Sequence, residues 1–175
     1  THERSSAASD VYKRQYVVYN GDPMHMYNNM IADDILPLQT RLKRDTSKLS
    51  MGLYVLFFGT DRQYRDVAHH TIWLGKRYKE LLDDIFHRQI LADDFSLYIH
   101  RPTATDASFA PVGHDSFYVL APVPHQGANI NWEHEEPRLR ERIIHALDAT
   151  LLPDLKQHIQ APFAMTPDDF ASDYL

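Results

Sequence analysis

The chain has 175 residues, of which 43% are hydrophobic, and this composition excludes a globally disordered protein. A formal net charge of −6 argues against a nucleic-acid partner, because binding to phosphates favours a basic face. The absence of cysteine excludes disulfides and thiolate metal sites, and no apolar run reaches the ~18–20 residues of a membrane-spanning helix. The length predicts one folded domain, or one domain with part of another.

The first 15 residues show no apolar periodicity and are polar in composition. Residues 10–15 read DVYKRQ, which is also the in-frame translation of a common transposon-end adapter of DNA library preparation. We therefore interpret residues 1–15 as a non-native, adapter-derived tail and leave them out of the fold prediction. The alternative is a natural disordered tail.

The next residues predict one short strand and two helical segments. Residues 16–19 are rich in β-forming side chains and are closed by a turn around Gly21. Asp22 can cap a helix that has Pro23 at its first position and runs to about residue 31. Residues 36–48 are polar and basic, which predicts a short helix or a linker.

The middle of the chain alternates between strand and helix patterns. Residues 51–58 are nearly all apolar and predict a strand buried on both faces, with a short buried helix as the alternative, and residues 68–74 predict a second, shorter strand. From Arg77 onward, apolar side chains follow the spacing of one helix face. Residues 95–100 predict another strand.

The last third predicts two strands and two helices. Residues 117–123 predict a strand whose prolines favour a position at the edge of a sheet. Pro137 is expected to open the strongest helix, residues 160–165 to form a strand, and Thr166 to cap a final helix. The element order therefore predicts an α+β fold with a mixed, largely antiparallel sheet flanked by helices.

No pattern of residues predicts a self-contained catalytic site. The eleven histidines include no H-E-x-x-H or H-x-H spacing. Adjacent residues of a strand point to opposite faces, so His69 and His70 are not expected to share a metal ion. No G-x-S-x-G turn is present either, so the catalytic residues are unknown. This pattern is compatible with an enzyme whose cofactor carries the redox chemistry.

Several segments resemble one enzyme family in order and in spacing. They include SMGLYVLFFGT at residues 50–60, AHHTIWLG at 68–75, DFSLYIHRPTATD at 94–106 and SFYVLAPVPH at 116–125. Shorter matches are VVYNGDP at residues 17–23, with Gly21 in place of the usual alanine, and MTPDDF at 165–170. Together they are similar to bacterial phytoene desaturase, of the carotenoid desaturase family of FAD-dependent oxidoreductases.

The resemblance implies an enzyme that dehydrogenates phytoene stepwise toward neurosporene or lycopene in carotenoid biosynthesis. It implies FAD as the hydride acceptor, and a quinone or oxygen that reoxidises the flavin. The implied substrates are phytoene and related C40 polyenes, and the implied location is cytoplasmic, peripherally associated with the cytoplasmic membrane. The alternatives are a related carotenoid flavoenzyme, namely a later-step desaturase, a saturase or a ketolase, or a non-enzymatic binding module.

The family's dinucleotide-binding turn, G-x-G-x-x-G, does not occur in the sequence. We therefore expect an internal or C-terminal-half fragment that neither holds FAD nor acts by itself. Residues 16–35 are expected to be the residual part of the FAD-binding domain, with one of its edge strands, and residues 36–175 a truncated substrate-binding domain.

The resemblance also directs the choice of binding residues. Aromatic candidates for the walls of a substrate channel are Tyr54, Phe57, Phe58, Trp73, Tyr98 and Phe117, for which the alternative is ordinary core. Polar candidates near the flavin or the channel mouth are His70, His100, Arg101 and Thr103. Asn20 and Asp22 are candidates for cofactor contacts, and no metal is expected. A buried Arg101 would require a carboxylate partner such as Asp106 or Asp115.

Overall fold

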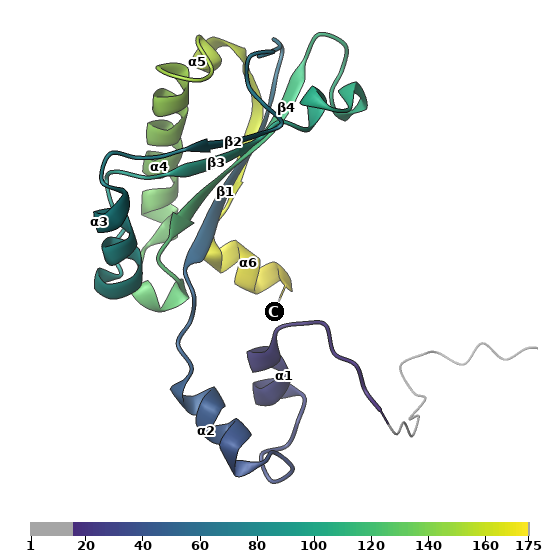
Figure 1. Ribbon diagram of the computed structural model, residues 1–175, viewed down its shortest axis with the longest axis vertical. Coiled ribbons are helices and arrows are strands. Elements are labelled where there is room, and N and C mark those ends of the chain that lie inside the picture. Colours follow the sequence, from purple (N-terminus) through teal and green to yellow (C-terminus); the bar gives the residue numbers. More distant parts are fainter. Residues whose placement is uncertain (1–15, 175) are drawn as a thin grey trace, which may run out of the picture. The chain divides into compact units, whose positions relative to one another are not determined.

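The computed structural model describes residues 16–174, and the chain divides between Ser47 and Lys48 into two compact units (Figure 1). The expected tail, residues 1–15, lies outside the described residues. The boundary expected after residue 35 lies earlier in the chain than this division. The assignment of the two parts to cofactor and substrate domains stays a prediction.

The first unit contains two short helices, α1 (Pro23–Asn29) and α2 (Leu38–Thr46). The Asp22 carboxylate accepts a hydrogen bond of 2.7 Å from the backbone N–H of His25, which confirms the predicted cap. The strand predicted at residues 16–19 is wrong for the described chain. These residues are exposed and pair with no described strand, and an unpaired extended segment lacks the ladder of hydrogen bonds that defines a strand.

The second unit is built on a five-stranded sheet in the order β2-β3-β4-β1-β5, in which each neighbouring pair is antiparallel. Its strands are β1 (Gly52–Thr60), β2 (His70–Trp73), β3 (Leu97–His100), β4 (Asp115–Val123) and β5 (Ile159–Met165). Together with the helices beside it, this sheet confirms the predicted α+β class.

Four helices accompany this sheet in the chain: α3 (Tyr78–Asp83), α4 (Trp132–Asp148), α5 (Leu155–His158) and α6 (Pro167–Tyr174). Helix α3 continues into a wider π-helical turn at Asp84–Arg88. As expected, Thr166 caps α6, because its hydroxyl oxygen accepts from the Asp169 N–H at 3.4 Å. In return, the Asp169 carboxylate accepts from the Thr166 N–H and hydroxyl, each at 2.7 Å. Within residues 16–174, no helix combines the length and the apolar character needed to cross a membrane.

Helix α4 covers one face of the sheet (Figure 1). Its apolar stripe, with Leu139, Ile143 and Leu147 at 0–1% exposure, packs against alternate residues of β1, β3 and β4. The spacing of this stripe follows the helical period, so all three side chains reach the same face. This side of the sheet is called the core face below.

Two sequence predictions about this unit are wrong. Helix α4 begins at Trp132 instead of Pro137, because the Asn131 side chain caps it by accepting from the His134 N–H at 3.3 Å. Strand β4 is central instead of lying at an edge. Its pairing with β3 ends at Leu120, so Pro122 has only β1 beside it and the missing N–H interrupts no ladder with β3.

Candidate binding site on the open face of the sheet

The face of the sheet opposite the core face carries a continuous row of aromatic rings. Cross-strand pairing places Phe163, Phe57, Tyr118, His100 and His70 side by side, one from each strand. This set is called the aromatic row. The Phe57 and Phe163 rings stack with centroids 4.8 Å apart, and the Tyr118 ring lies 6.0 Å from that of Phe57.

The row continues into imidazoles toward the β2 edge. The centroid of the His100 ring lies 4.8 Å from that of Tyr118 and 5.2 Å from that of His70, which stacks on it. The Phe163 and His70 side chains are exposed, and the three between them are partly buried. A half-exposed aromatic surface of this kind offers flat apolar contact area that the core of this unit does not use.

The neighbouring row on the same face is also largely apolar. Leu120 lies between Val55 and Tyr98 in the pairing, and Ile72 is opposite Tyr98 on the edge strand. Ile72 is 64% exposed although it is aliphatic. The two rows together make the open face an apolar surface with histidines at one end.

An apolar groove of about 350 Å³ lies where α6 meets the start of β1. Its apolar lining includes Leu49, Met51, Leu53, Phe170 and Tyr174. Leu53 shares a side of β1 with Phe57, because side chains alternate along a strand. The groove therefore adjoins the open face and extends its apolar surface.

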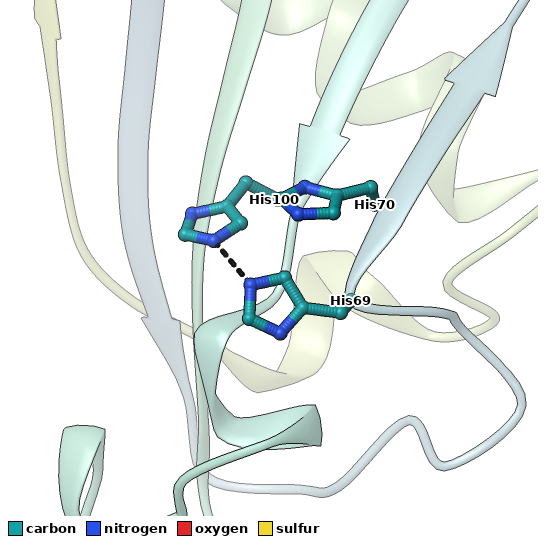
Figure 2. Close-up of side chains that lie close together, drawn as sticks. All are labelled: His69, His70 and His100. Atoms are coloured by element: carbon teal, nitrogen blue, oxygen red, sulfur yellow. Dashed lines mark hydrogen bonds between the residues drawn. The ribbon is translucent and has the colours of Figure 1, made fainter.

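Three histidines gather at the β2 edge, and Figure 2 shows that they come from two neighbouring segments. His69 Nε2 lies 2.8 Å from His100 Nε2, and His70 Nδ1 lies 2.7 Å from the Tyr98 hydroxyl. His69 Nδ1 is also hydrogen-bonded to the Thr105 hydroxyl. Burial, followed by the nearby His69 and His70, lowers the pKa of His100.

The expectation that strand alternation keeps His69 and His70 from sharing an ion is wrong. One nitrogen from each of them and one from His100 lie within 4.8 Å of one another. Strand β2 begins at His70, so His69 lies just before the strand and the alternation of faces does not apply to it.

A buried ion pair supports the end of β4 beside this cluster. Asp115 Oδ2 accepts from Arg101 Nη1 at 3.2 Å and from the backbone N–H of Tyr64 at 2.7 Å. Its other oxygen accepts from the Thr103 hydroxyl at 2.6 Å. This confirms that a buried Arg101 has a carboxylate partner, and that partner is Asp115; the Asp106 carboxylate instead accepts from the Ser108 N–H.

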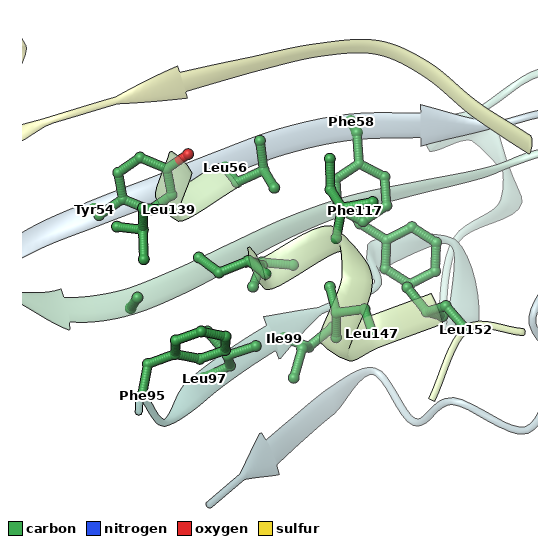
Figure 3. Close-up of a cluster of buried hydrophobic side chains, with 14 of the residues drawn as sticks. Tyr54, Leu56, Phe58, Phe95, Leu97, Ile99, Phe117, Leu139, Leu147 and Leu152 are labelled. Atoms are coloured by element: carbon green, nitrogen blue, oxygen red, sulfur yellow. The ribbon is translucent and has the colours of Figure 1, made fainter. Parts of the chain in front are cut away.

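The structure divides the predicted aromatic candidates between the two faces. Tyr54, Phe58 and Phe117 are at most 4% exposed and belong to the core that packs on α4 (Figure 3). Trp73 packs partly buried against the same core. Phe57 and Tyr98 lie on the open face with His70 and His100. A role of each residue in substrate binding stays a prediction.

Sequence reasoning missed two members of the aromatic row. Tyr118 and Phe163 lie inside segments that are predicted as strands. Strand alternation could have placed Tyr118 on the face opposite Phe117, whereas the face of Phe163 depends on the pairing of β5 with β1. The predicted cofactor contacts lie in the first unit, where Asp22 caps α1.

The described residues do not fit an FAD pyrophosphate site. Such a site needs a glycine-rich turn that leads from a strand into the N-terminus of a helix. The six glycines are dispersed, and Gly52 and Gly59 lie within β1 itself. Residues 16–174 therefore supply no glycine-rich cradle for the flavin pyrophosphate.

Comparison with known proteins finds phytoene desaturases of similar sequence, although no family model matches the chain. Over 157 residues, 89% of the chain, it is 43% identical to a lycopene-forming phytoene desaturase of Pantoea ananas. It is 44% identical over 158 residues, 90% of the chain, to the enzyme of that name from a Paracoccus strain. A neurosporene-forming phytoene desaturase of Rhodobacter capsulatus is 39% identical over 166 residues, 92% of the chain.

The class of protein that these relatives share is that of the desaturases. Within this class, the three relatives are phytoene desaturases, and the chain is similar to a segment of each along about nine tenths of its own length, as its sequence segments indicated. It spans 32% of the length of each of these relatives.

Proposed function

We propose that this chain is part of an FAD-dependent phytoene desaturase, which removes hydrogen from phytoene stepwise toward neurosporene or lycopene. The observation that carries this proposal is identity of 39–44% to lycopene- and neurosporene-forming relatives over about nine tenths of the chain. The described residues supply a binding surface, and the redox chemistry belongs to a flavin held by other parts of the enzyme.

The aromatic row suits a long unsaturated hydrocarbon. Flat rings bury large apolar area, and their faces pack against a planar polyene without needing polar partners. Neighbouring strands lie ~4.8 Å apart, so a row across five strands extends over about 19 Å. We propose that this surface holds an extended stretch of the substrate and excludes water from it.

We also propose that the enzyme works at the surface of the cytoplasmic membrane, with a quinone or oxygen as the final electron acceptor. Phytoene is a hydrocarbon that dissolves in lipid, so its enzyme must take it from a membrane. The apolar groove beside α6, with Met51 and Tyr174 exposed at its rim, supports a surface that contacts lipid.

A chimera tests the proposal. In the Pantoea ananas desaturase, the matching segment is replaced by the corresponding 157 residues of this chain, and the chimera is expressed in cells that accumulate phytoene. Lycopene is expected, measured by extraction and absorbance. Phe57→Asp in the chimera is expected to lower pigment yield at least ~10-fold. The reason is that a hydrocarbon bound on the aromatic row would remove water from the new carboxylate, which costs free energy.

Val112→Asp is the matched control, since Val112 is fully exposed and the same charge replaces an apolar side chain there. Immunoblots show whether each chimera accumulates. A chimera that accumulates and retains FAD but forms no desaturated product contradicts the proposed function. Equal pigment yields from the Phe57 and Val112 variants contradict the role of the aromatic row.

A further inference from the structure

We propose that His69, His70 and His100 form a binding site for a divalent transition metal of the zinc type. This inference goes beyond the proposed function and does not depend on it. It rests on three imidazoles whose nitrogens lie within 4.8 Å of one another at one end of the open face.

The spacing is close to that of a metal site. Zn–N bonds of ~2.0–2.1 Å at tetrahedral angles place ligand nitrogens about 3.3 Å apart. The observed 2.8 Å between His69 Nε2 and His100 Nε2 is slightly shorter than this value. The ligand nitrogens of all three histidines lie within 4.8 Å of one another, a limit that is longer than this value. Small side-chain rotations therefore suffice to bring all three nitrogens onto one ion.

Hydrogen bonds on the other ring nitrogens favour the tautomer that a metal needs. When Nδ1 of His69 donates to the Thr105 hydroxyl, and Nδ1 of His70 donates to the Tyr98 hydroxyl, both Nε2 atoms carry lone pairs. The lone pair of His69 Nε2 then accepts from His100 Nε2 at 2.8 Å, and a metal ion would take the place of that shared proton. Metal-binding histidines usually have such a partner on the second nitrogen, which fixes the ring orientation. Thr105 and Tyr98 fill this role here.

The chemistry of the ligand set limits the choice of ion. The cluster consists of three imidazoles, without thiolate or carboxylate, and imidazole binds Zn²⁺, Ni²⁺, Cu²⁺ or Co²⁺ in preference to Mg²⁺ or Ca²⁺. His70 is exposed, so a fourth coordination position is open to solvent. Three protein ligands with one open position is an arrangement that Zn²⁺ adopts in proteins.

The position of the cluster also gives the ion a structural effect. His70 is the first residue of β2 and is paired with His100, the last residue of β3. Strand β2 has four residues and lies at the edge of the sheet. An ion shared by these residues would tie the edge strand to β3 and raise the stability of the folded chain in proportion to its binding.

Zinc titration of the tag-free, EDTA-stripped 175-residue chain tests this inference. Calorimetry is expected to show one equivalent of Zn²⁺ bound, and a thermal melt is expected to shift upward with Zn²⁺. Co²⁺ should produce the visible absorption bands of a site with nitrogen ligands. His69→Asn, His70→Asn and His100→Asn should each weaken binding at least ~10-fold, and Tyr98→Phe about 10-fold.

His134→Ala is the matched control, because His134 is an exposed histidine on α4 outside the cluster. Circular dichroism in EDTA establishes that each variant is folded. His70→Asn gives the deciding comparison if His100→Asn unfolds, since the His70 side chain is exposed. Absence of stoichiometric Zn²⁺ binding by the folded chain overturns the inference, as does equal affinity in His70→Asn and His134→Ala.

Discussion

Leu56 and Phe57 are neighbours on β1 and belong to different surfaces. Leu56 is fully buried in the core face against α4, whereas Phe57 stacks on Phe163 in the partly exposed aromatic row. The same alternation runs through β3 and β4. One sheet therefore separates two kinds of surface: its core face supplies stability, and its open face carries apolar side chains that the core does not bury.

The largest effect on stability is expected at the end of the core face. Asp115→Ala removes the partner of the buried Arg101 and leaves its charge uncompensated, along with the Tyr64 N–H and the Thr103 hydroxyl. We expect a loss of about 3–5 kcal/mol in the free energy of unfolding, measured by urea denaturation. Asp106→Ala, on an exposed carboxylate that contacts Ser108, is the control and should cost far less. Equal losses would show that the buried pair is not important for stability.

A smaller effect is expected at Tyr54, whose hydroxyl donates to Glu136 at 3.0 Å. Tyr54→Phe should cost about 0.5–1.5 kcal/mol near neutral pH through loss of this bond. Burial, followed by the Glu136 charge, raises the pKa of Tyr54. The folded state therefore holds this proton more tightly than the unfolded state.

The sign of the pH effect follows from this difference. The stabilisation is complete below the unfolded tyrosine pKa of about 10 and declines as pH rises above it. Denaturation at about pH 8 and about pH 10.5 should show a steeper alkaline loss in the parent chain than in Tyr54→Phe. Parallel losses in the two proteins would contradict the buried phenol as the cause.

The smallest effect is expected on the open face, where one substitution is compared with the same substitution in the core. Ile99→Val removes a methylene from a fully buried core residue and should cost about 0.5–1.5 kcal/mol. Ile72→Val, on a side chain that is 64% exposed, should stay within about 0.5 kcal/mol. Thermal melts of the two variants measure the difference. A larger loss at Ile72 would show that the open face is covered by packing of its own.

Local signals predicted those features that depend on nearby residues. The caps at Asp22 and Thr166 and the apolar stripe of α4 could be read from the sequence, because their partners lie within a few residues. The sequence did not predict the helix start at Trp132, because Pro137 is a stronger sequence signal for a helix start than the Asn131 cap that sets it. The central position of β4 depends on pairing with β1, more than 50 residues earlier in the chain, which no local pattern specifies.

The candidate site was predictable only in part for the same reason. The sequence predicted four of the residues on this face as binding candidates, namely Phe57, Tyr98, His70 and His100. Their alignment on one surface depends on the register between separate strands, which the sequence does not specify. Tyr54 and Phe117 carry the same kind of aromatic signal and lie in the core instead. Only the packing of α4 decides which face of a strand is covered. The histidine cluster forms because β2 begins at His70 and leaves His69 just outside the strand, and the sequence does not define a strand end to within one residue.

The two outer strands of the sheet have a consequence for self-association. Strand β2 has only four residues. Strand β5 is irregular: it contains Pro162, its Ala161 has a φ of 45°, and its register with β1 shifts between Phe57 and Gly59. Short, irregular or proline-containing borders are poor templates for the addition of further strands, so they protect a protein from polymerising into fibres. The sheet can therefore expose one apolar face while its irregular edge strands disfavour edge-to-edge association with other copies of the chain.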